Sequence, residues 1–420
     1  MSHRTDRRAL PAEVEVAVVG GGPAGLAAAT RLKEHGVSTV AVLDREPAAG
    51  GIPRHCGHYP FGMREFHRVL RGPDYARRLV ERAGAVGVAI HSATTVVGLM
   101  PGPRLLISTA DGQATLSARR VLLATGVRET SRAARMIGGQ RPLGVISTGA
   151  LQSLIYLADK RPFRRPVILG SELVSFSAIL TCRHAGIRPV AMIEEAPRVT
   201  AWRFAEALPR LLGIPLYLGT QLIWIHGGPR VEGVTLRLPD GGEQEIETDG
   251  VIVSGAFTPE ATLARLGHLA LDPGSGGPVV DQFGRCADGN FFAAGNLLRP
   301  VETAGWSWRE GIAAGDAVAD SLAGRLPAAE RLISVAVGSP VLKFALPQRI
   351  ALPIHTGGME HLQLRLNRAA RGRLTVSDAG GSVWEGPIAG LPERRILIPL
   401  KGFIDKVCGD TLTVSLAESA

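Results

Sequence analysis

VEVAVVGGGPAG, residues 14–25, is the stretch that decides the fold of this chain. Its apolar first half is typical of a buried strand, and an Ala-rich helical stretch follows it to about Lys33. Between them lies a G-x-G-x-x-G turn. Gly20 permits the tight turn, Gly22 lets the backbone approach a pyrophosphate, and Gly25 lets the helix pack closely on the strand. The stretch therefore predicts a dinucleotide-binding unit.

The residues that follow complete this unit. Pro23 and Ala24 begin the helix, whose bare amide groups face the phosphates. A second apolar strand, residues 39–43, ends at Asp44, whose carboxylate is placed to accept hydrogen bonds from an adenosine ribose. Strand, turn, helix, strand and acid in this order predict a Rossmann-like α/β fold.

A second unit of the same kind begins with the strand at residues 166–169. A turn and a helix to about Ala185 follow, and then a strand at 189–193 that ends in two glutamates. Here Glu172 stands at the second glycine position and Ser175 at the third. A carboxylate repels a pyrophosphate at close range, and the sequence offers no obvious cation to neutralise it. We expect this unit to bind NAD(P)H poorly or not at all, although a rearranged loop that admits the nucleotide stays open.

Composition and charge describe an ordinary globular protein. The chain has 420 residues, enough for two or three domains, and a formal net charge of +9. Its arginines are scattered, which favours a solvated surface over a nucleic-acid footprint and leaves an acidic partner or anionic substrate open. There is no apolar run long enough for a membrane span and no leader pattern in the polar first ten residues. We therefore expect a cytoplasmic protein.

The four cysteines lie far apart in the sequence, at positions 56, 182, 286 and 408. None of them belongs to a C-x-x-C or C-x-x-x-x-C pair. This spacing argues against an iron–sulfur cluster, a structural zinc or a redox-active dithiol contributed by this chain. We expect no metal site.

The order of the motifs indicates one domain inserted into another. We predict a first part of a FAD-binding domain at 1–135, an inserted second dinucleotide-fold domain at 136–260 and a return segment at 261–327. Residues 328–420 alternate polar and apolar positions, and the DAGGS sequence at 378–382 is a hairpin signal. We therefore predict a small β-rich C-terminal domain that serves as an interface or lid.

Three further segments resemble flavoproteins with two dinucleotide domains. Ala124-Thr125-Gly126 resembles their A-T-G turn, and Gly295-Asn296 resembles their A-x-G-D element with Asn in place of Asp. Gly311 belongs to a helical stretch, from Glu310 to about Leu322, that resembles the helix whose N-terminus points at the flavin. The resemblance implies FAD as cofactor, and among its further contacts we expect Arg45, Gly51 and Val96.

A narrower resemblance rests on residues 50–62, 70–76 and 295–302. These segments resemble FAD subunits that accompany glycerol-3-phosphate dehydrogenase, opine oxidase, sarcosine oxidase and hydrogen cyanide synthase in bacteria. In such complexes the substrate is usually oxidised on one flavin subunit, while another one, of the present type, relays electrons. The resemblance implies a partner oxidoreductase or electron-transfer subunit, and any iron–sulfur cluster would have to come from that partner.

Two side chains after the Gly50-Gly51 turn are candidates for catalysis. His58 would move a proton, since the pKa of histidine is near neutrality. Cys56 would act as a thiolate if His55 or Arg54 lowered its pKa. The alternative is that both side chains only pack and hydrogen-bond around the loop.

The sequence thus predicts a FAD-dependent oxidoreductase that forms part of a heteromeric dehydrogenase. Its flavin would pass on electrons from a small metabolite, namely an amine, an amino acid or a hydroxy acid. One alternative is an NAD(P)H-dependent flavoprotein reductase, and another is a non-catalytic docking subunit whose FAD is structural.

Overall fold

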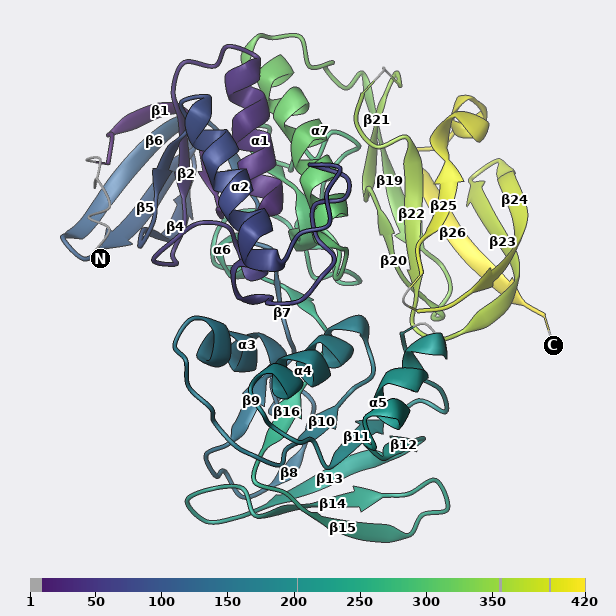
Figure 1. The fold of residues 1–420 in the computed structure, drawn as a ribbon. Coiled ribbons are helices and arrows are strands. Elements are labelled where there is room, and N and C mark those ends of the chain that lie inside the picture. The colour runs from purple at the N-terminus through teal and green to yellow at the C-terminus, as the bar shows by residue number, and fades with distance from the viewer. Residues whose placement is uncertain (1–9, 202, 355–356, 393, 420) are drawn as a thin grey trace.

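The computed structural model describes residues 10–201, 203–354, 357–392 and 394–419. Its first unit is built on a seven-stranded sheet with the order β3-β2-β1-β6-β5-β4, in which β18 also pairs with β6 (Figure 1). The strands that pair in parallel are β1 (Glu13–Val19), β2 (Val40–Leu43), β3 (Ala89–His91), β6 (Gly112–Leu123) and β18 (Phe291–Ala293). The antiparallel members are β4 (Thr95–Met100) and β5 (Arg104–Thr109).

Three helices lie side by side on one face of this sheet: α1 (Pro23–Glu34), α2 (Gly72–Ala85) and α7 (Ala304–Leu322) (Figure 1). Helices α1 and α7 approach closely because α7 has small residues at the contact. A Cβ on Gly311 would overlap the carbonyl oxygen of Ala24, and one on Gly315 would lie 3.0 Å from the oxygen of Ala28. The approach brings the return segment, from the last third of the chain, against the first turn.

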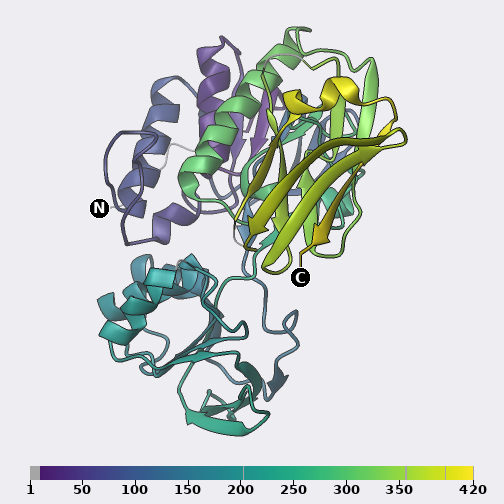
Figure 2. The same cartoon turned by 90° about the vertical axis from the view of Figure 1, so that its right-hand side faces the viewer.

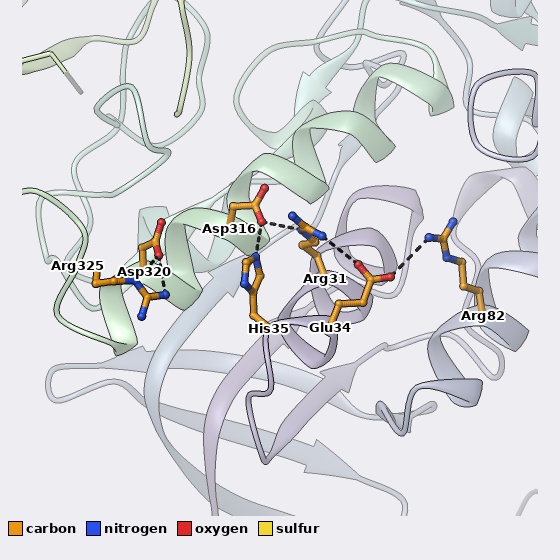
Figure 3. A network of polar contacts seen from close by, with 7 residues as sticks. All are labelled: Arg31, Glu34, His35, Arg82, Asp316, Asp320 and Arg325. Atoms are coloured by element: carbon orange, nitrogen blue, oxygen red, sulfur yellow. Dashed lines mark hydrogen bonds and ion pairs between the residues drawn. The ribbon is translucent and has the colours of Figure 1, made fainter. Parts of the chain in front are cut away.

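Polar contacts join the same helices at their solvent side (Figure 3). The Asp316 carboxylate on α7 contacts Arg31 Nε at 2.6 Å and His35 Nε2 at 2.5 Å, both from the end of α1. Glu34 pairs with Arg31 at 3.3 Å and with Arg82 of α2 at 3.5 Å. The three helices are therefore tied by charges as well as by apolar packing.

The second unit repeats this plan with a five-stranded parallel sheet of order β12-β11-β10-β16-β9. Its strands are β9 (Val145–Ser147), β10 (Val167–Leu169), β11 (Ala191–Glu194), β12 (Leu216–Leu218) and β16 (Val251–Val253). A four-stranded sheet adjoins it, formed by β8 (Gly138–Gly139), β13 (Gln221–His226), β14 (Gly233–Arg237) and β15 (Glu243–Glu247). Its helices are α3 (Thr148–Tyr156), α4 (Leu173–His184) and α5 (Ala207–Leu211).

Two chain crossings connect the units. They pair with each other as the short antiparallel strands β7 (Val127–Arg128) and β17 (Thr258–Pro259), and α6 (Thr262–Leu266) follows the second crossing. Figure 2 shows the second unit below the first, with the C-terminal sheets beside the first unit. The crossings therefore lie between the two nucleotide-type turns.

The C-terminal region is β-rich, as predicted. Its five-stranded sheet contains β19 (Arg331–Val337), β21 (Arg349–Leu352), β23 (Ala370–Asp378), β24 (Gly381–Gly390) and β26 (Thr411–Glu418). Its three-stranded sheet contains β20 (Leu342–Leu346), β22 (His361–Leu366) and β25 (Ile396–Pro399). The hairpin expected at 378–382 connects β23 and β24.

The predicted Rossmann-like α/β fold class is confirmed, whereas the domain boundaries stay a prediction. One element differs from the sequence analysis. Helix α7 begins at Ala304, six residues before the predicted start at Glu310, with Thr303 as its N-cap. The aromatic and charged residues 306–310 carry no helix-start signal in the sequence, and packing on the first unit makes them helical.

Within the described residues, none of the helices combines the length and the apolar character that crossing a membrane requires. The same residues contain no group of three His, Cys, Asp or Glu side chains placed to hold a metal ion. The cytoplasmic location stays a prediction.

Candidate functional site

The first glycine turn forms an open cradle at the start of α1. Gly20 has a φ of 107°, a conformation that favours glycine, and its N–H donates to Leu43 O at 2.9 Å. Gly22 is the N-cap of α1 and has no side chain to cap the first amides. A Cβ at Gly22 would meet only the Cα of Gly51, at 3.9 Å. Free amides and missing side chains on both walls fit a diphosphate group.

Asp44 lies at the end of β2 directly beneath this turn. It is buried, its Oδ2 accepts the Gly21 N–H at 2.9 Å, and its Oδ1 accepts the Glu46 N–H at 2.8 Å. Burial raises the pKa of Asp44, and these two donors lower it in part. Each oxygen keeps a lone pair for a ribose hydroxyl. Arg45 next to it is exposed and lies 4.0 Å from Glu46.

The predicted contacts at Val96 and at the A-T-G turn lie at the same edge of the sheet. The Thr94 N–H donates to Asp44 O at 2.9 Å, which places the start of β4, with the buried Val96, next to β2. Ala124 N–H donates to Val19 O at 2.8 Å, so this turn directly adjoins the glycine turn. Thr125 Oγ1 donates to Glu260 O at 2.8 Å and so connects the two crossings.

The return segment closes the cradle opposite Asp44. A Cβ at Gly295 would lie 2.8 Å from Ala24 Cβ, so only glycine permits this approach to α1. Ser307 lies beside Gly295 and was missed by the sequence analysis. Its buried Oγ finds no hydrogen-bond partner among the described residues. A buried hydroxyl without a partner at this place fits a polar group of FAD. In the sequence, the only sign of this role was the position of Ser307 near the start of the helix that follows Gly295.

Two expectations for the return segment change. The side chain of Asn296 donates from Nδ2 to Glu302 O at 3.1 Å, and its Oδ1 accepts the Glu302 N–H at 2.8 Å. The Asn296 side chain therefore closes its own loop. Only its second amide hydrogen and the second lone pair of its oxygen are left for a cofactor. Gly311 does not lie at a helix start, because α7 begins at Ala304; its role is close packing on Ala24.

Cys56 and His58 follow the 3-10 helix η1 (Ile52–His55), on the loop beyond Gly51. The Cys56 thiol is buried and faces Ile52 O at 3.4 Å and Gln152 Oε1 at 3.5 Å. Burial, and secondarily the Glu129 carboxylate, raises the pKa of Cys56 to about 12. This is the opposite of what a reactive thiolate requires.

The basic neighbours do not change that result. Burial lowers the pKa of His55, and the Arg54 guanidinium donates to Ala48 O at 2.5 Å. His58 is half-buried. Its ring is tilted against Phe61 with centroids 5.5 Å apart, and its Nδ1 lies 3.0 Å from Tyr59 O. Of the two predicted catalytic side chains, His58 is therefore the less buried, and its catalytic role stays a prediction.

The second turn is closed by its own side chains. Gly170 has the same φ of 107° as Gly20, but Ser171 donates from its hydroxyl to the buried Glu194 carboxylate. Glu172 is the N-cap of α4, and its Oε1 accepts the Ala256 N–H at 2.6 Å. The Glu172 carboxyl carbon lies 2.6 Å from where a Cβ of Gly255 would be, so the carboxylate fills the space above the crossing.

The expectation that nothing neutralises Glu172 is corrected by two cations. Burial raises the pKa of Glu172, while the Arg135 guanidinium and the Lys343 ammonium lower it in part. They come from the segment after the A-T-G turn and from β20, so neither was recognisable as a neighbour in the sequence. The Glu172 carboxylate is therefore hydrogen-bonded and partly compensated by cations, rather than an uncompensated charge.

Comparisons with known proteins agree with this geometry. A family model described as pyridine nucleotide-disulphide oxidoreductase matches residues 14–311. Dihydrolipoyl dehydrogenase from Pseudomonas aeruginosa is 26% identical over 406 residues, which are 86% of this chain and 82% of that protein. One of the opine oxidase subunits from Rhizobium meliloti is 29% identical over 215 residues, which are 50% of this chain and 45% of that protein.

Among solved structures, thioredoxin reductase from T. acidophilum has a TM-score of 0.61 at 22% identity. The likeness covers 74% of this chain and 99% of that chain, and it concerns the fold. The family match, the relatives and the open cradle together identify a flavoprotein oxidoreductase with FAD as its cofactor. The chain belongs to the pyridine nucleotide-disulphide oxidoreductase family.

Proposed function

We propose that this chain is the FAD-binding subunit of a heteromeric dehydrogenase and receives electrons that originate from a small metabolite. The observation that carries the proposal is the second turn, where Glu172 is seated on the Ala256 N–H at 2.6 Å. An NAD(P)H pyrophosphate would have to displace this carboxylate and remain beside it. The electron donor is therefore sought outside the nicotinamides.

Two further observations support a donor on another chain. The similarity to a protein named as one of the subunits of opine oxidase favours a multi-subunit enzyme. All four cysteines are unpaired, and the buried Cys56 has a raised pKa. A thiol held in this state does not support the disulfide exchange after which the family is named.

The residues of the first unit divide the binding task among them. Gly20, Gly22 and Gly25 would admit the diphosphate, and Asp44 would hold the adenosine ribose. Bound FAD would supply two-electron redox chemistry. His58 would hold or move a proton at its imidazole, and we assign Cys56 a packing role. Amines, amino acids and hydroxy acids are the proposed substrate classes.

An anaerobic spectral titration of the FAD-loaded chain tests the donor. The reductants are NADH, NADPH, glycerol 3-phosphate and a panel of secondary amines, each added with and without the polypeptide that co-purifies with the chain. We expect flavin bleaching by one of the metabolites only when the partner is present, and slow or absent bleaching by both nicotinamides. Rapid bleaching of the isolated chain by NADH or NADPH would overturn the proposal.

That last result would establish the alternative, an NAD(P)H-dependent reductase, which the family match and the similarity to dihydrolipoyl dehydrogenase favour. The non-catalytic alternative makes a different prediction. If the flavin of this chain stays oxidised while the complex turns over under anaerobic conditions, its FAD is structural and the chain serves only for docking.

A further inference from the structure

A compact excursion of the chain projects from the first unit between η1 and α2. We name it the basic knob and define it as residues 62–69. Its ends are pinned by a pair of hydrogen bonds, from Phe61 N to Leu70 O at 3.0 Å and from Leu70 N to Phe61 O at 2.9 Å. Within it, Gly62 O accepts the N–H of Phe66 at 3.0 Å. The backbone is thus fixed at its base and within its turn.

Side chains on the inner face hold the basic knob to the core. The ring of Phe66 packs edge-on against Tyr75 of α2, with centroids 6.0 Å apart. Glu65 is buried, and its carboxylate accepts the Tyr75 hydroxyl at 2.7 Å. The surface that the knob presents is therefore preorganised, which reduces the entropy cost of docking.

The outer face combines apolar and cationic side chains. Met63 and Val69 are 58% and 59% exposed, and Arg64, His67 and Arg68 are exposed beside them. Residues 52–71 contain a single acidic side chain, and it is the buried Glu65; the arginines of this segment are Arg54, Arg64, Arg68 and Arg71. The exposed side chains of the knob are therefore basic or apolar, and none of them is a carboxylate.

The basic knob lies beside the proposed FAD site. Arg64 lies over the ring of Trp306, with Cζ 4.1 Å from its centroid, and Trp306 belongs to the first turn of α7. Arg395, from the start of the β25 region, lies over the same ring at 3.9 Å. In Figure 1 the dark blue loop that contains the knob runs beside the lower end of α7. A protein bound here would adjoin the start of α7 and the return segment.

We propose that the basic knob is the docking surface for the partner oxidoreductase subunit, which presents carboxylates around an apolar patch. This inference rests on the proposed function, because it names where the partner binds. Methionine and arginine are enriched in protein interfaces and lysine is depleted, and the knob has both of the former and no lysine. Forked guanidinium groups match carboxylates geometrically.

Two other binding partners, a membrane surface and a second copy of the chain, fit the side chains of the basic knob less well. A membrane-binding surface commonly combines cations with Trp, Phe or Leu, and the outward apolar residues here are Met63 and Val69. A second copy of the chain would bring two like-charged knobs together in a symmetric dimer, which is unfavourable. The experiments below distinguish the partner subunit from both of these alternatives.

The test compares hydrogen exchange in the full-length, FAD-loaded chain and in its complex with the co-purified partner. We expect peptides that cover residues 62–69 to be protected in the complex. In addition, Arg68→Glu and Met63→Ser should each weaken partner binding by about 10-fold, a hot-spot effect. The matched controls, Arg104→Glu at the exposed start of β5 and Met136→Ser at an 89% exposed methionine, should change affinity by less than about 2-fold.

FAD content and thermal melting of each variant establish that it is folded. A complex in which residues 62–69 exchange as in the isolated chain overturns the docking site and leaves the proposed function standing. A chain that never co-purifies with an oxidoreductase subunit overturns both. Binding to anionic vesicles, or self-association in light scattering, that Arg68→Glu abolishes while partner binding persists would also overturn the assignment.

Discussion

The two glycine-type turns of this protein share one backbone and differ in what their side chains leave open. Gly20 N–H donates to Leu43 O at 2.9 Å, and Gly170 N–H donates to Ile193 O at 2.7 Å. The neighbouring crossings match as well, since Ala124 bonds to the end of β1 and Ser254 to the end of β10. Even the unusual φ is the same, 107° in both turns.

The side chains of the two turns, in contrast, differ. In the first turn, Gly21 donates its N–H to Asp44, and Gly22 has no side chain to cap the first amides of α1. In the second turn, the Ser171 hydroxyl donates to the Glu194 carboxylate, and the Glu172 side chain covers the crossing at Gly255. The same backbone frame therefore carries different side chains, and these side chains set how much space is left above each turn. Exchanging residues between the turns tests this directly.

The largest expected effect comes from carrying the second turn's carboxylate into the first. Gly22→Glu should weaken FAD binding about 1000-fold, because a charge about 4 Å from a phosphate costs about 4 kcal/mol at an effective dielectric constant of about 20. Flavin content and fluorescence titration measure the loss. Gly22→Ala separates size from charge: its Cβ would meet only Gly51, at 3.9 Å, so the fold should tolerate it, and its loss of flavin should be smaller than that of Gly22→Glu. Full flavin retention by Gly22→Glu would contradict the assignment of the site.

A smaller effect is expected on stability when the third positions are exchanged. Gly25→Ser should lower the free energy of unfolding by about 3 kcal/mol, because its Cβ would overlap Gly20 O. Ser175→Gly should cost about 1.5 kcal/mol, through the 2.9 Å hydrogen bond to Ser254 and the flexibility of glycine in a helix. Urea denaturation compares the two. Equal losses would show that the turns are packed alike.

The smallest expected effect concerns pH. Burial raises the pKa of Glu172, so its neutral form persists to higher pH than that of an ordinary glutamate. As the pH is lowered, any residual reduction by NADH should therefore rise, because the carboxylate is protonated at a higher pH than an ordinary glutamate. Glu172→Gln removes this titration, and its rate should stay flat as the pH is lowered. A parallel rise in both proteins would assign the pH dependence to another group.

Sequence patterns predicted the architecture well where local chemistry decides the structure. The strand, glycine turn and helix at residues 14–34 and their repeat at 166–185 lie where expected, because periodicity and turn residues are encoded locally. The β-rich C-terminal region was predicted for the same reason. FAD as cofactor also followed from motifs that act over short stretches.

The remaining features depend on contacts between distant segments. The raised pKa of Cys56 comes from burial against α3, and the counter-charges of Glu172 come from Arg135 and Lys343. The start of α7 is set by packing on α1. The burial of Ser307 depends on the close approach of Gly295. Spacing in the sequence carries no information on such neighbours.

Anaerobic stopped-flow reduction by NADH decides whether the Glu172 carboxylate closes the second turn. It compares the wild type, Glu172→Gly and the control Glu247→Gly, an exposed residue on β15. We expect the flavin of Glu172→Gly to be bleached at least about 10-fold faster than that of the wild type, since one unfavourable contact of about 1.4 kcal/mol accounts for that factor. Glu247→Gly should match the wild type. A wild-type chain that NADH already bleaches as fast as Glu172→Gly would contradict the claim that the Glu172 carboxylate closes the second turn.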